Sequence, residues 1–226
     1  MTRPWHTLDH VETREGELEL RQRGDGDFLI TIGGRILMNS SANRSEGRLA
    51  DWVCEELREK QAPRLMIGGL GMGCTLRAAL DRLPADAHVV VVELTRIVGE
   101  WCAGPLSGVN ANALEDPRVE VVIGDVSKAI RRTADDRSLP RLDAILLDLY
   151  EGPHSRTNPG RDPFYGSRAL HATRRALVQG GLFAIWSEGP DTGFEKRAQR
   201  AGFGLEVERA GKGGRRHAVY LARRIR

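Results

Sequence analysis

The sequence predicts an α/β fold: a mostly parallel sheet that closes with a C-terminal antiparallel hairpin and is preceded by a small N-terminal β-hairpin. A glycine-rich turn joins an apolar run to a helix-forming segment within residues 64–77. From there, β-branched runs alternate with helical patterns, and two alternating runs joined by glycines close the chain. This alternation indicates a parallel sheet, because the crossovers between parallel strands usually carry a helix.

The N-terminal part predicts a separate β element. Over residues 17–38, two segments of strand-like pattern flank a turn rich in glycine and aspartate. A helix is expected over 46–60, where apolar residues recur on one face, and Pro63 marks its end. We therefore divide the chain into a small hairpin segment, 1–45, and a larger α/β domain, 46–226.

The remaining elements follow from the same patterns. Strands are expected at 64–67, 88–93, 119–125, 142–148, 181–187, 205–209 and 217–223. Helices are expected near 74–83, 95–102, 127–134, 168–178 and 193–201. No internal repeat or low-complexity tract interrupts this order.

The glycine-rich turn predicts a nucleotide-binding site. Glycine lets the main chain take left-handed conformations and lets a ligand approach closely. The dinucleotide pattern G-x-G-x-x-G does not fit, but Gly69, Gly71 and Gly73 match the G-x-G-x-G pattern of class I S-adenosylmethionine-dependent enzymes. The alternative is a turn that only packs a helix against a sheet.

Acidic residues follow three of the expected strands. In open α/β sheets, ligands bind at the edge where the strands end. There Glu93 is predicted to accept hydrogen bonds from ribose hydroxyls, and Asp125 from the adenine amino group, with Val126 against the ring. Asp148 ends the third such strand. Together with the glycines, these residues predict an adenosyl-sulfonium site for S-adenosylmethionine or its decarboxylated form.

Composition indicates an enzyme-sized protein. The 226 residues are 40% hydrophobic and 29% charged, and no apolar run reaches the ~18 residues of a membrane span. The N-terminus lacks the apolar core of a signal peptide. We expect a cytoplasmic protein without a membrane partner.

Cysteines and basic residues suggest no further site. Cys54, Cys74 and Cys102 are widely spaced and lack metal-ligand spacing, so we interpret them as small buried apolar residues and expect no metal. The formal net charge of +3 reflects a basic C-terminal portion. We interpret those charges as solvated surface and do not expect nucleic acid as a partner.

Five segments together resemble the spermidine synthase family, the polyamine aminopropyltransferases: residues 67–77, 91–93, 116–125, 143–148 and 175–182. The resemblance covers roughly residues 17–187. It implies a Rossmann-like class I methyltransferase fold, aminopropyl transfer from decarboxylated S-adenosylmethionine to a polyamine, and a homodimer.

The resemblance also implies roles for individual residues. Asp148 and Glu151 match the family's D-x-x-D-P acids and are the predicted catalytic residues, although a solvated loop acid remains an alternative for Glu151. Tyr150, His154 and Tyr165 are the predicted substrate-binding residues. They lie on or beside a turn-rich loop, 152–165, which has the character of a lid.

Departures from the family pattern favour a different reaction. Where the family's glycine loop carries an aspartate that engages the aminopropyl amine, we place Met72, and Glu151 replaces the second acid. We therefore expect a spermidine synthase-like transferase that moves the methyl group of S-adenosylmethionine to a small molecule. Aminopropyl transfer to a diamine is the alternative. A nucleic-acid-modifying enzyme and a non-catalytic nucleoside-binding protein are kept as further hypotheses.

Overall fold

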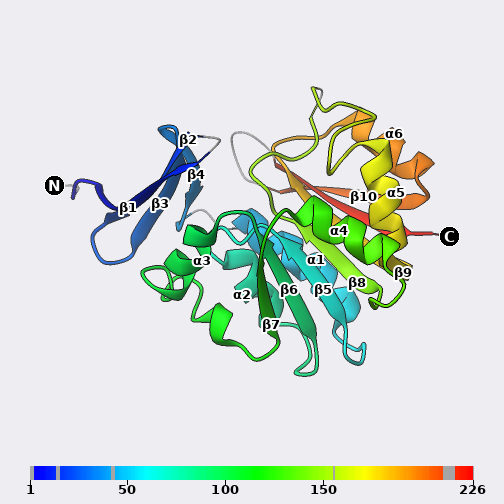
Figure 1. The fold of residues 1–226 in the computed structure, drawn as a ribbon, viewed down its shortest axis with the longest axis horizontal. Coiled ribbons are helices and arrows are strands. Elements are labelled where there is room, and N and C mark those ends of the chain that lie inside the picture. The colour runs from blue at the N-terminus through cyan, green and yellow to red at the C-terminus, as the bar shows by residue number, and fades with distance from the viewer. Residues whose placement is uncertain (1–2, 14–15, 42–43, 155, 211–216, 226) are drawn as a thin grey trace.

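The chain contains two β-sheets, one of them covered by helices on both faces (Figure 1). The structure, a computed structural model, describes residues 3–225 except 14–15, 42–43, 155 and 211–216. A four-stranded N-terminal sheet lies beside a seven-stranded central sheet. The central sheet carries the candidate site.

The N-terminal sheet is antiparallel and larger than the hairpin predicted from the sequence. Its strands, in spatial order, are β1 (His6–Thr13), β2 (Gly16–Arg23), β3 (Asp27–Ile32) and β4 (Arg35–Asn39). The returning arm of the predicted hairpin divides at Gly33 and Gly34, whose φ angles of 51° and 78° favour glycine. In addition, β1 pairs with the outer side of β2.

The central sheet confirms the predicted fold class. Its spatial order is β10-β11-β9-β8-β5-β6-β7, with neighbouring strands parallel from β9 to β7 and antiparallel in the C-terminal hairpin. The strands are β5 (Arg64–Gly68), β6 (His88–Glu93), β7 (Val119–Ile123), β8 (Leu142–Leu147), β9 (Leu177–Ser187), β10 (Phe203–Ala210) and β11 (His217–Arg224).

The helices also follow the predicted order. They are α1 (Arg44–Leu57), α2 (Cys74–Leu80), α3 (Arg96–Ala103), α4 (Val126–Asp135), α5 (Ser167–Ala176) and α6 (Thr192–Arg200), with a short 3₁₀ helix at Ala113–Glu115. One boundary differs from prediction, because β9 begins directly after α5. Leu177 pairs with Leu142, and the next residues bulge out before pairing resumes at Leu182.

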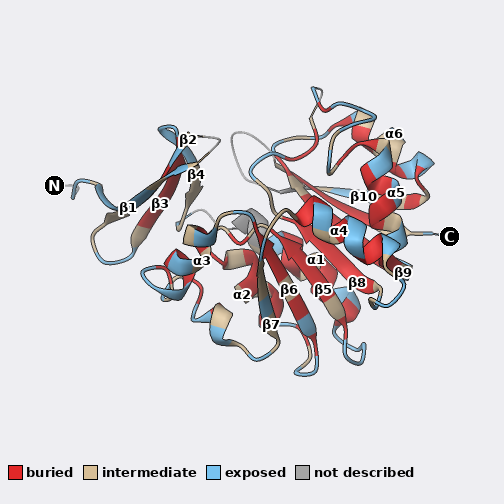
Figure 2. Cartoon of the chain, in the orientation of Figure 1, coloured by how far each residue is buried: buried red, intermediate tan, exposed pale blue. Residues whose placement is uncertain are grey.

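Two hydrophobic clusters sandwich the sheet (Figure 2). One packs α1, α2 and α3 against one face, and the other packs α4, α5 and α6 against the opposite face. Successive residues of β5 enter opposite clusters, as the two-residue period of a strand requires: Leu65 and Ile67 join the first cluster and Met66 the second. Burial on both faces explains the continuous apolar character of these strands.

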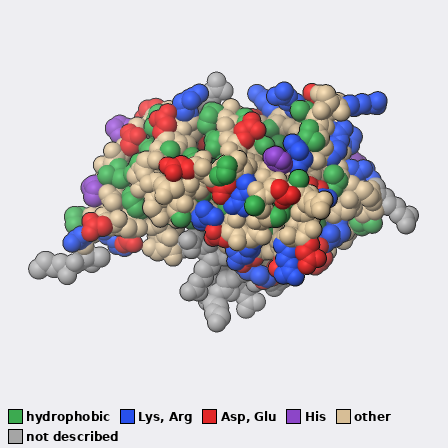
Figure 3. Space-filling model, turned by 90° about the horizontal axis from the view of Figure 1, so that it is seen from below, with side chains coloured by type: hydrophobic (Ala, Val, Ile, Leu, Met, Phe, Trp, Pro, Cys, Tyr) green, Lys and Arg blue, Asp and Glu red, His purple; other side chains and the backbone are tan. Residues whose placement is uncertain are grey.

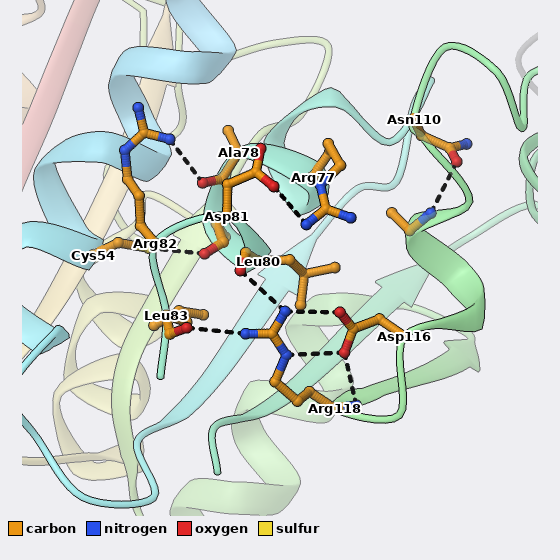
Figure 4. A network of polar contacts seen from close by, with 12 residues as sticks. Cys54, Arg77, Ala78, Leu80, Asp81, Arg82, Leu83, Asn110, Asp116 and Arg118 are labelled. Atoms are coloured by element: carbon orange, nitrogen blue, oxygen red, sulfur yellow. Dashed lines mark hydrogen bonds and ion pairs between the residues drawn. The ribbon is translucent and has the colours of Figure 1, made fainter. Parts of the chain in front are cut away.

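A partly buried polar network ties α2 to the segment just before β7, at the amino end of the sheet (Figure 4). The Arg118 guanidinium donates to both carboxylate oxygens of Asp116, at 2.9 and 2.7 Å. It also donates to the carbonyls of Leu80 and Leu83, each at 3.0 Å, where α2 and its following turn end. Hydrogen bonding to Arg118 lowers the pKa of Asp116 to about 2. The network therefore stabilises the C-terminal end of α2, whose other end adjoins the glycine turn.

The described surface carries charges of both signs, and two of the three cysteines are buried. Acidic and basic side chains are interspersed over the face shown in Figure 3, and the basic residues at 212, 215 and 216 lie outside the described residues. No helix in the described ranges is long and apolar enough to cross a membrane. Cys54 and Cys102 are buried, which raises the pKa of each thiol to about 12, and Cys74 is half-buried.

Candidate functional site

The ends of four parallel strands bring the predicted nucleoside-binding residues to one edge of the central sheet. Gly68 at the end of β5 pairs with Val92 of β6 on one side and with Leu147 of β8 on the other. Glu93 in turn pairs with Ile123 at the end of β7. The glycine turn, Glu93, Asp125 and Asp148 therefore follow adjacent strands, as the sequence predicted.

The glycine turn is tightly packed against protein atoms. Gly69, Gly71 and Gly73 have φ angles of 88°, 54° and 82°, all in the left-handed region. A Cβ atom would collide with the Asp148 carbonyl oxygen at Gly69 and with the Met38 thioether at Gly71. At Gly73 it would lie 2.7 Å from the Cβ of Asn110. Packing thus requires these glycines with or without a ligand, and the alternative of a packing turn stays open.

Glu93 holds the turn in place. Its side chain is buried, with 8% exposed, and Oε2 accepts a hydrogen bond of 2.9 Å from the Leu70 main-chain N–H. Oε1 accepts one of 2.9 Å from the Thr95 N–H. Each carboxylate oxygen has two lone pairs, so both could accept ribose hydroxyls as well. Ribose binding by Glu93 remains a prediction.

Asp125 begins α4. Its Oδ1 accepts a hydrogen bond of 2.8 Å from the Ser127 main-chain N–H. Burial opposes ionisation, but hydrogen bonds from Ser127 and from the Lys128 main chain outweigh it and lower the pKa of Asp125. Val126 is buried in the core between α4 and the sheet. An ionised Asp125 is suited to the predicted hydrogen bond from adenine, a contact that remains a prediction.

Asp148 is joined to the glycine turn through both its main chain and its side chain. Its N–H donates to the Gly68 carbonyl at 3.0 Å. Its Oδ2 accepts a hydrogen bond of 2.5 Å from the hydroxyl of Thr75, a buried residue in the first turn of α2. Thr75 was not among the residues predicted for the site. The one available signal was a hydroxyl residue two positions beyond the glycine turn.

The loop after Asp148 faces the N-terminal sheet. Tyr150 is 41% exposed, and the Arg35 guanidinium carbon of β4 lies 5.4 Å from the centre of its ring, a cation–π geometry. Met38 of the same strand contacts Gly71, and Asp9 of β1 accepts a hydrogen bond of 2.8 Å from the Trp101 indole of α3. The N-terminal sheet therefore borders the candidate site.

Glu151 and His154 lie close to each other on this loop. The His154 Nε2 is 3.6 Å from the Glu151 Oε2. The His154 Nδ1 accepts a hydrogen bond of 3.1 Å from the Arg156 main-chain N–H, which leaves Nε2 as the atom facing Glu151. Both side chains are about half exposed, at 40% for His154 and 60% for Glu151, so solvent competes with this contact.

Tyr165 is the last residue of the loop and is buried. Its side chain is 3% exposed, and its ring packs edge-on against Phe194, with the ring centres 6.0 Å apart. Its hydroxyl donates to the Glu151 carbonyl at 3.1 Å. Burial raises the pKa of this phenol. The structure thus places Tyr165 as a support for the loop, and the predicted contact with substrate would require the loop to open.

Met72 does not have the role inferred from the sequence. Its side chain is fully buried in the cluster between the sheet and α1, α2 and α3. A side chain that points into the core cannot contact the reacting end of a cofactor. Met72 itself therefore does not discriminate between methyl transfer and aminopropyl transfer.

Trp186 is a second residue that the structure brings to the site. Leu147 pairs with Ile185, so Trp186, near the end of β9, lies at the level where Asp148 follows β8. Its ring stacks on that of His217, with the centres 5.0 Å apart. The main chain of Trp186 also lies against Gly152, where a Cβ atom would be 2.5 Å from the Trp186 carbonyl oxygen.

Two hollows of the surface lie away from the predicted site residues. They have volumes of about 180 and 140 Å³ and lie toward the amino ends of the parallel strands, lined among others by His88 and Arg118 in one and by Lys60 and Asp143 in the other. Neither contains a predicted site residue. No cluster of potential metal ligands occurs within the described residues.

Comparison with known proteins places the chain near one group. Residues 54–195 match the spermine/spermidine synthase domain. The chain is 29% identical over 174 residues to the polyamine aminopropyltransferase of Mycobacterium tuberculosis, covering 77% of this chain and 31% of that protein. For the polyamine aminopropyltransferase of Nitrosomonas europaea, identity is 33% over 132 residues, covering 56% and 35%. The chain thus spans about a third of the length of these relatives.

Solved structures agree on the fold. A spermidine synthase in complex with the transition-state analogue AdoDATO superimposes with a TM-score of 0.71 at 16% identity, covering 96% of this chain and 72% of that chain. The spermidine synthase of Thermotoga maritima gives a TM-score of 0.71 at 18% identity with the same coverage.

Proposed function

We propose that this chain, which belongs to the spermine/spermidine synthase family, transfers the aminopropyl group of decarboxylated S-adenosylmethionine to an amine acceptor. One observation carries the proposal. The family match spans the glycine turn and all three strand-end acids, and Asp148 is hydrogen-bonded to both the end of β5 and α2. Aminopropyl transfer was the alternative reaction inferred from the sequence. The names of the relatives support it and do not support methyl transfer.

The donor would be held by the edge of the sheet. Main-chain groups at Gly69, Gly71 and Gly73 border its sulfonium end, Glu93 accepts the ribose hydroxyls, and Asp125 accepts the adenine amino group. These side chains suit a cationic nucleoside, because carboxylates attract the sulfonium charge and accept hydrogen bonds from hydroxyl and amino groups.

Asp148 would act as the base. A free amine has a pKa near ~10 and is protonated at neutral pH, so it must lose a proton before it can attack. The donor supplies an electrophilic carbon, whose bond to the sulfonium sulfur breaks as the new carbon–nitrogen bond forms and neutral methylthioadenosine leaves. The Asp148 carboxylate accepts the amine proton, and Glu151 and Tyr150 bind the acceptor from the loop. His154 positions Glu151, and Tyr165 supports the loop from below.

The released nucleoside distinguishes the two transfers. The protein would be incubated with either donor and a panel of amines, and the products separated by chromatography. Decarboxylated donor with an amine should give methylthioadenosine and an aminopropylated amine in equal amounts. S-adenosylhomocysteine formed from S-adenosylmethionine, with no reaction of the decarboxylated donor, would restore methyl transfer. Calorimetric titration with methylthioadenosine and both donors tests binding separately.

The family resemblance also supports a homodimer and a cytoplasmic location. Sedimentation equilibrium of the purified chain tests the first, and a mass equal to one chain at all concentrations would contradict it. Cell fractionation tests the second.

A further inference from the structure

We infer that Thr75 is a positioning residue that holds the Asp148 carboxylate in its reactive orientation. The inference deepens the proposed function and rests on the role of Asp148 as the base. Thr75 belongs to α2 and Asp148 follows β8, so the contact joins the helix after the glycine turn to the loop that carries the predicted acids.

The main chain at Asp148 is already constrained. Its N–H donates to the Gly68 carbonyl at 3.0 Å, and its own carbonyl oxygen lies against the Cα of Gly69 with no room for a side chain. What the main chain leaves undetermined is the rotation of the side chain, because a carboxylate turns easily about its last torsion. A donor on a neighbouring element can select one orientation.

Thr75 is well placed to be that donor. Its side chain is 3% exposed, and its hydroxyl lies 2.5 Å from Oδ2 of Asp148. A hydroxyl-to-carboxylate bond of this length is among the shorter and stronger hydrogen bonds in proteins. Burial of Thr75 keeps water from replacing it. A hydrogen bond that holds Oδ2 keeps the whole carboxylate in one orientation relative to the acceptor amine.

The same contact couples donor binding to catalysis. Thr75 is two residues from Gly73, and the Thr75–Asp148 bond therefore connects the turn that borders the donor with the group that deprotonates the acceptor. A residue that acts in this way should affect the rate of the bound complex more than the affinity for either substrate.

The test compares T75V, which keeps the shape of the side chain without the hydroxyl, with T75S, which keeps the hydroxyl. Since misplacement of a reacting group by about 1 Å costs up to about 100-fold, we expect T75V to lower kcat by about 10- to 100-fold with KM for both substrates changed less than about 3-fold. T75S should recover most of the lost kcat.

The matched control is T133V. Thr133 is also buried, with 7% exposed, and its hydroxyl donates to the Ala129 carbonyl within α4. Loss of this hydroxyl removes a buried hydrogen bond remote from Asp148, so kcat should not change. An equal loss of kcat in T133V and T75V would mean that T75V acts through general destabilisation and would overturn the inference.

A double-mutant cycle shows whether Thr75 acts through Asp148. In a D148N background, T75V should cost little further activity, whereas a full additional loss would contradict the inference. The ¹³C signal of the Asp148 carboxyl provides a readout that needs no turnover. Relative to the original protein, the chemical shift of this signal should change in T75V and stay the same in T75S. An identical chemical shift in the original protein, T75V and T75S would overturn the inference, even if the chain transfers a group other than aminopropyl.

Discussion

The two edges of the central sheet hold their acids in different ways. At the amino edge, Asp116 pairs with Arg118 at 2.7 Å and Asp143 with Lys60 at 2.6 Å. At the carboxyl edge, Glu93 and Asp125 accept hydrogen bonds from neutral main-chain N–H groups. No Lys or Arg within the described ranges forms an ion pair with Glu93 or Asp125.

This difference separates acids that stabilise the fold from acids that are suited to a ligand. A carboxylate paired with arginine has its charge compensated inside the protein. One held by neutral donors is oriented without losing its negative charge, which remains able to attract a cationic ligand. The comparison predicts that changes at the carboxyl edge affect binding and catalysis, and that changes at the amino edge affect stability.

The largest effect is expected from D148N. Replacing the base by an amide removes the proton acceptor, and general base catalysis contributes about 10²- to 10⁴-fold, so kcat should fall by that factor. Titration with methylthioadenosine should show nearly unchanged affinity. Full activity in D148N would remove Asp148 from its proposed role as the base.

At the opposite edge, R118A should destabilise the protein by about 3 kcal/mol without a specific effect on the reaction. The substitution leaves a mostly buried Asp116 carboxylate and two helix-end carbonyls without their donor. Urea unfolding measures the loss. The comparison fails if the folded variant loses kcat while its free energy of unfolding is unchanged.

E93A should weaken nucleoside binding by about 1–3 kcal/mol, because hydrogen-bonding groups of the ligand and of the turn lose their acceptor. Calorimetry with methylthioadenosine measures the affinity, and thermal unfolding in parallel reports how much of the effect comes from the turn. Affinity equal to that of the original protein would exclude Glu93 from the site.

The smallest effect concerns pH. The pKa of Asp116 is lowered to about 2 by Arg118, below the ~3.9 of an unfolded chain. A lowered folded-state pKa contributes stability above the unfolded pKa, and that contribution, about 2 kcal/mol, is lost as pH falls from about 4 toward 2. The free energy of unfolding of D116N should therefore fall less steeply than that of the original protein over this window. Parallel pH profiles would contradict the assignment.

The sequence predicted the elements that depend on local pattern. The apolar runs 89–92 of β6 and 144–147 of β8 have no polar face to expose, so a sheet covered on both sides accommodates them. The acids Glu93, Asp125 and Asp148 then meet at one edge as a consequence of parallel pairing. The N-terminal hairpin was predicted only in part. Strand β1 was missed, because it is defined by its pairing with β2 and not by a pattern of its own.

Contacts between distant segments were not predictable in this way. Thr75 and Asp148 are 73 positions apart, and no local pattern indicates that α2 presents a hydroxyl to the end of β8. The burial of Met72 and Tyr165 was not predictable for the same reason, since a pattern of residue types does not say toward which layer a turn or loop directs a side chain.

The sequence by itself therefore determined the class of fold, the order of strands and helices, and the edge at which three acids gather, because the strand and helix patterns are local and parallel strands end at the same edge of a sheet. Only the tertiary structure decided which groups hold each acid: main-chain donors for Glu93 and Asp125, and the Thr75 hydroxyl for Asp148. Hydrogen bonds depend on distance and direction in space, and folding alone brings such partners together.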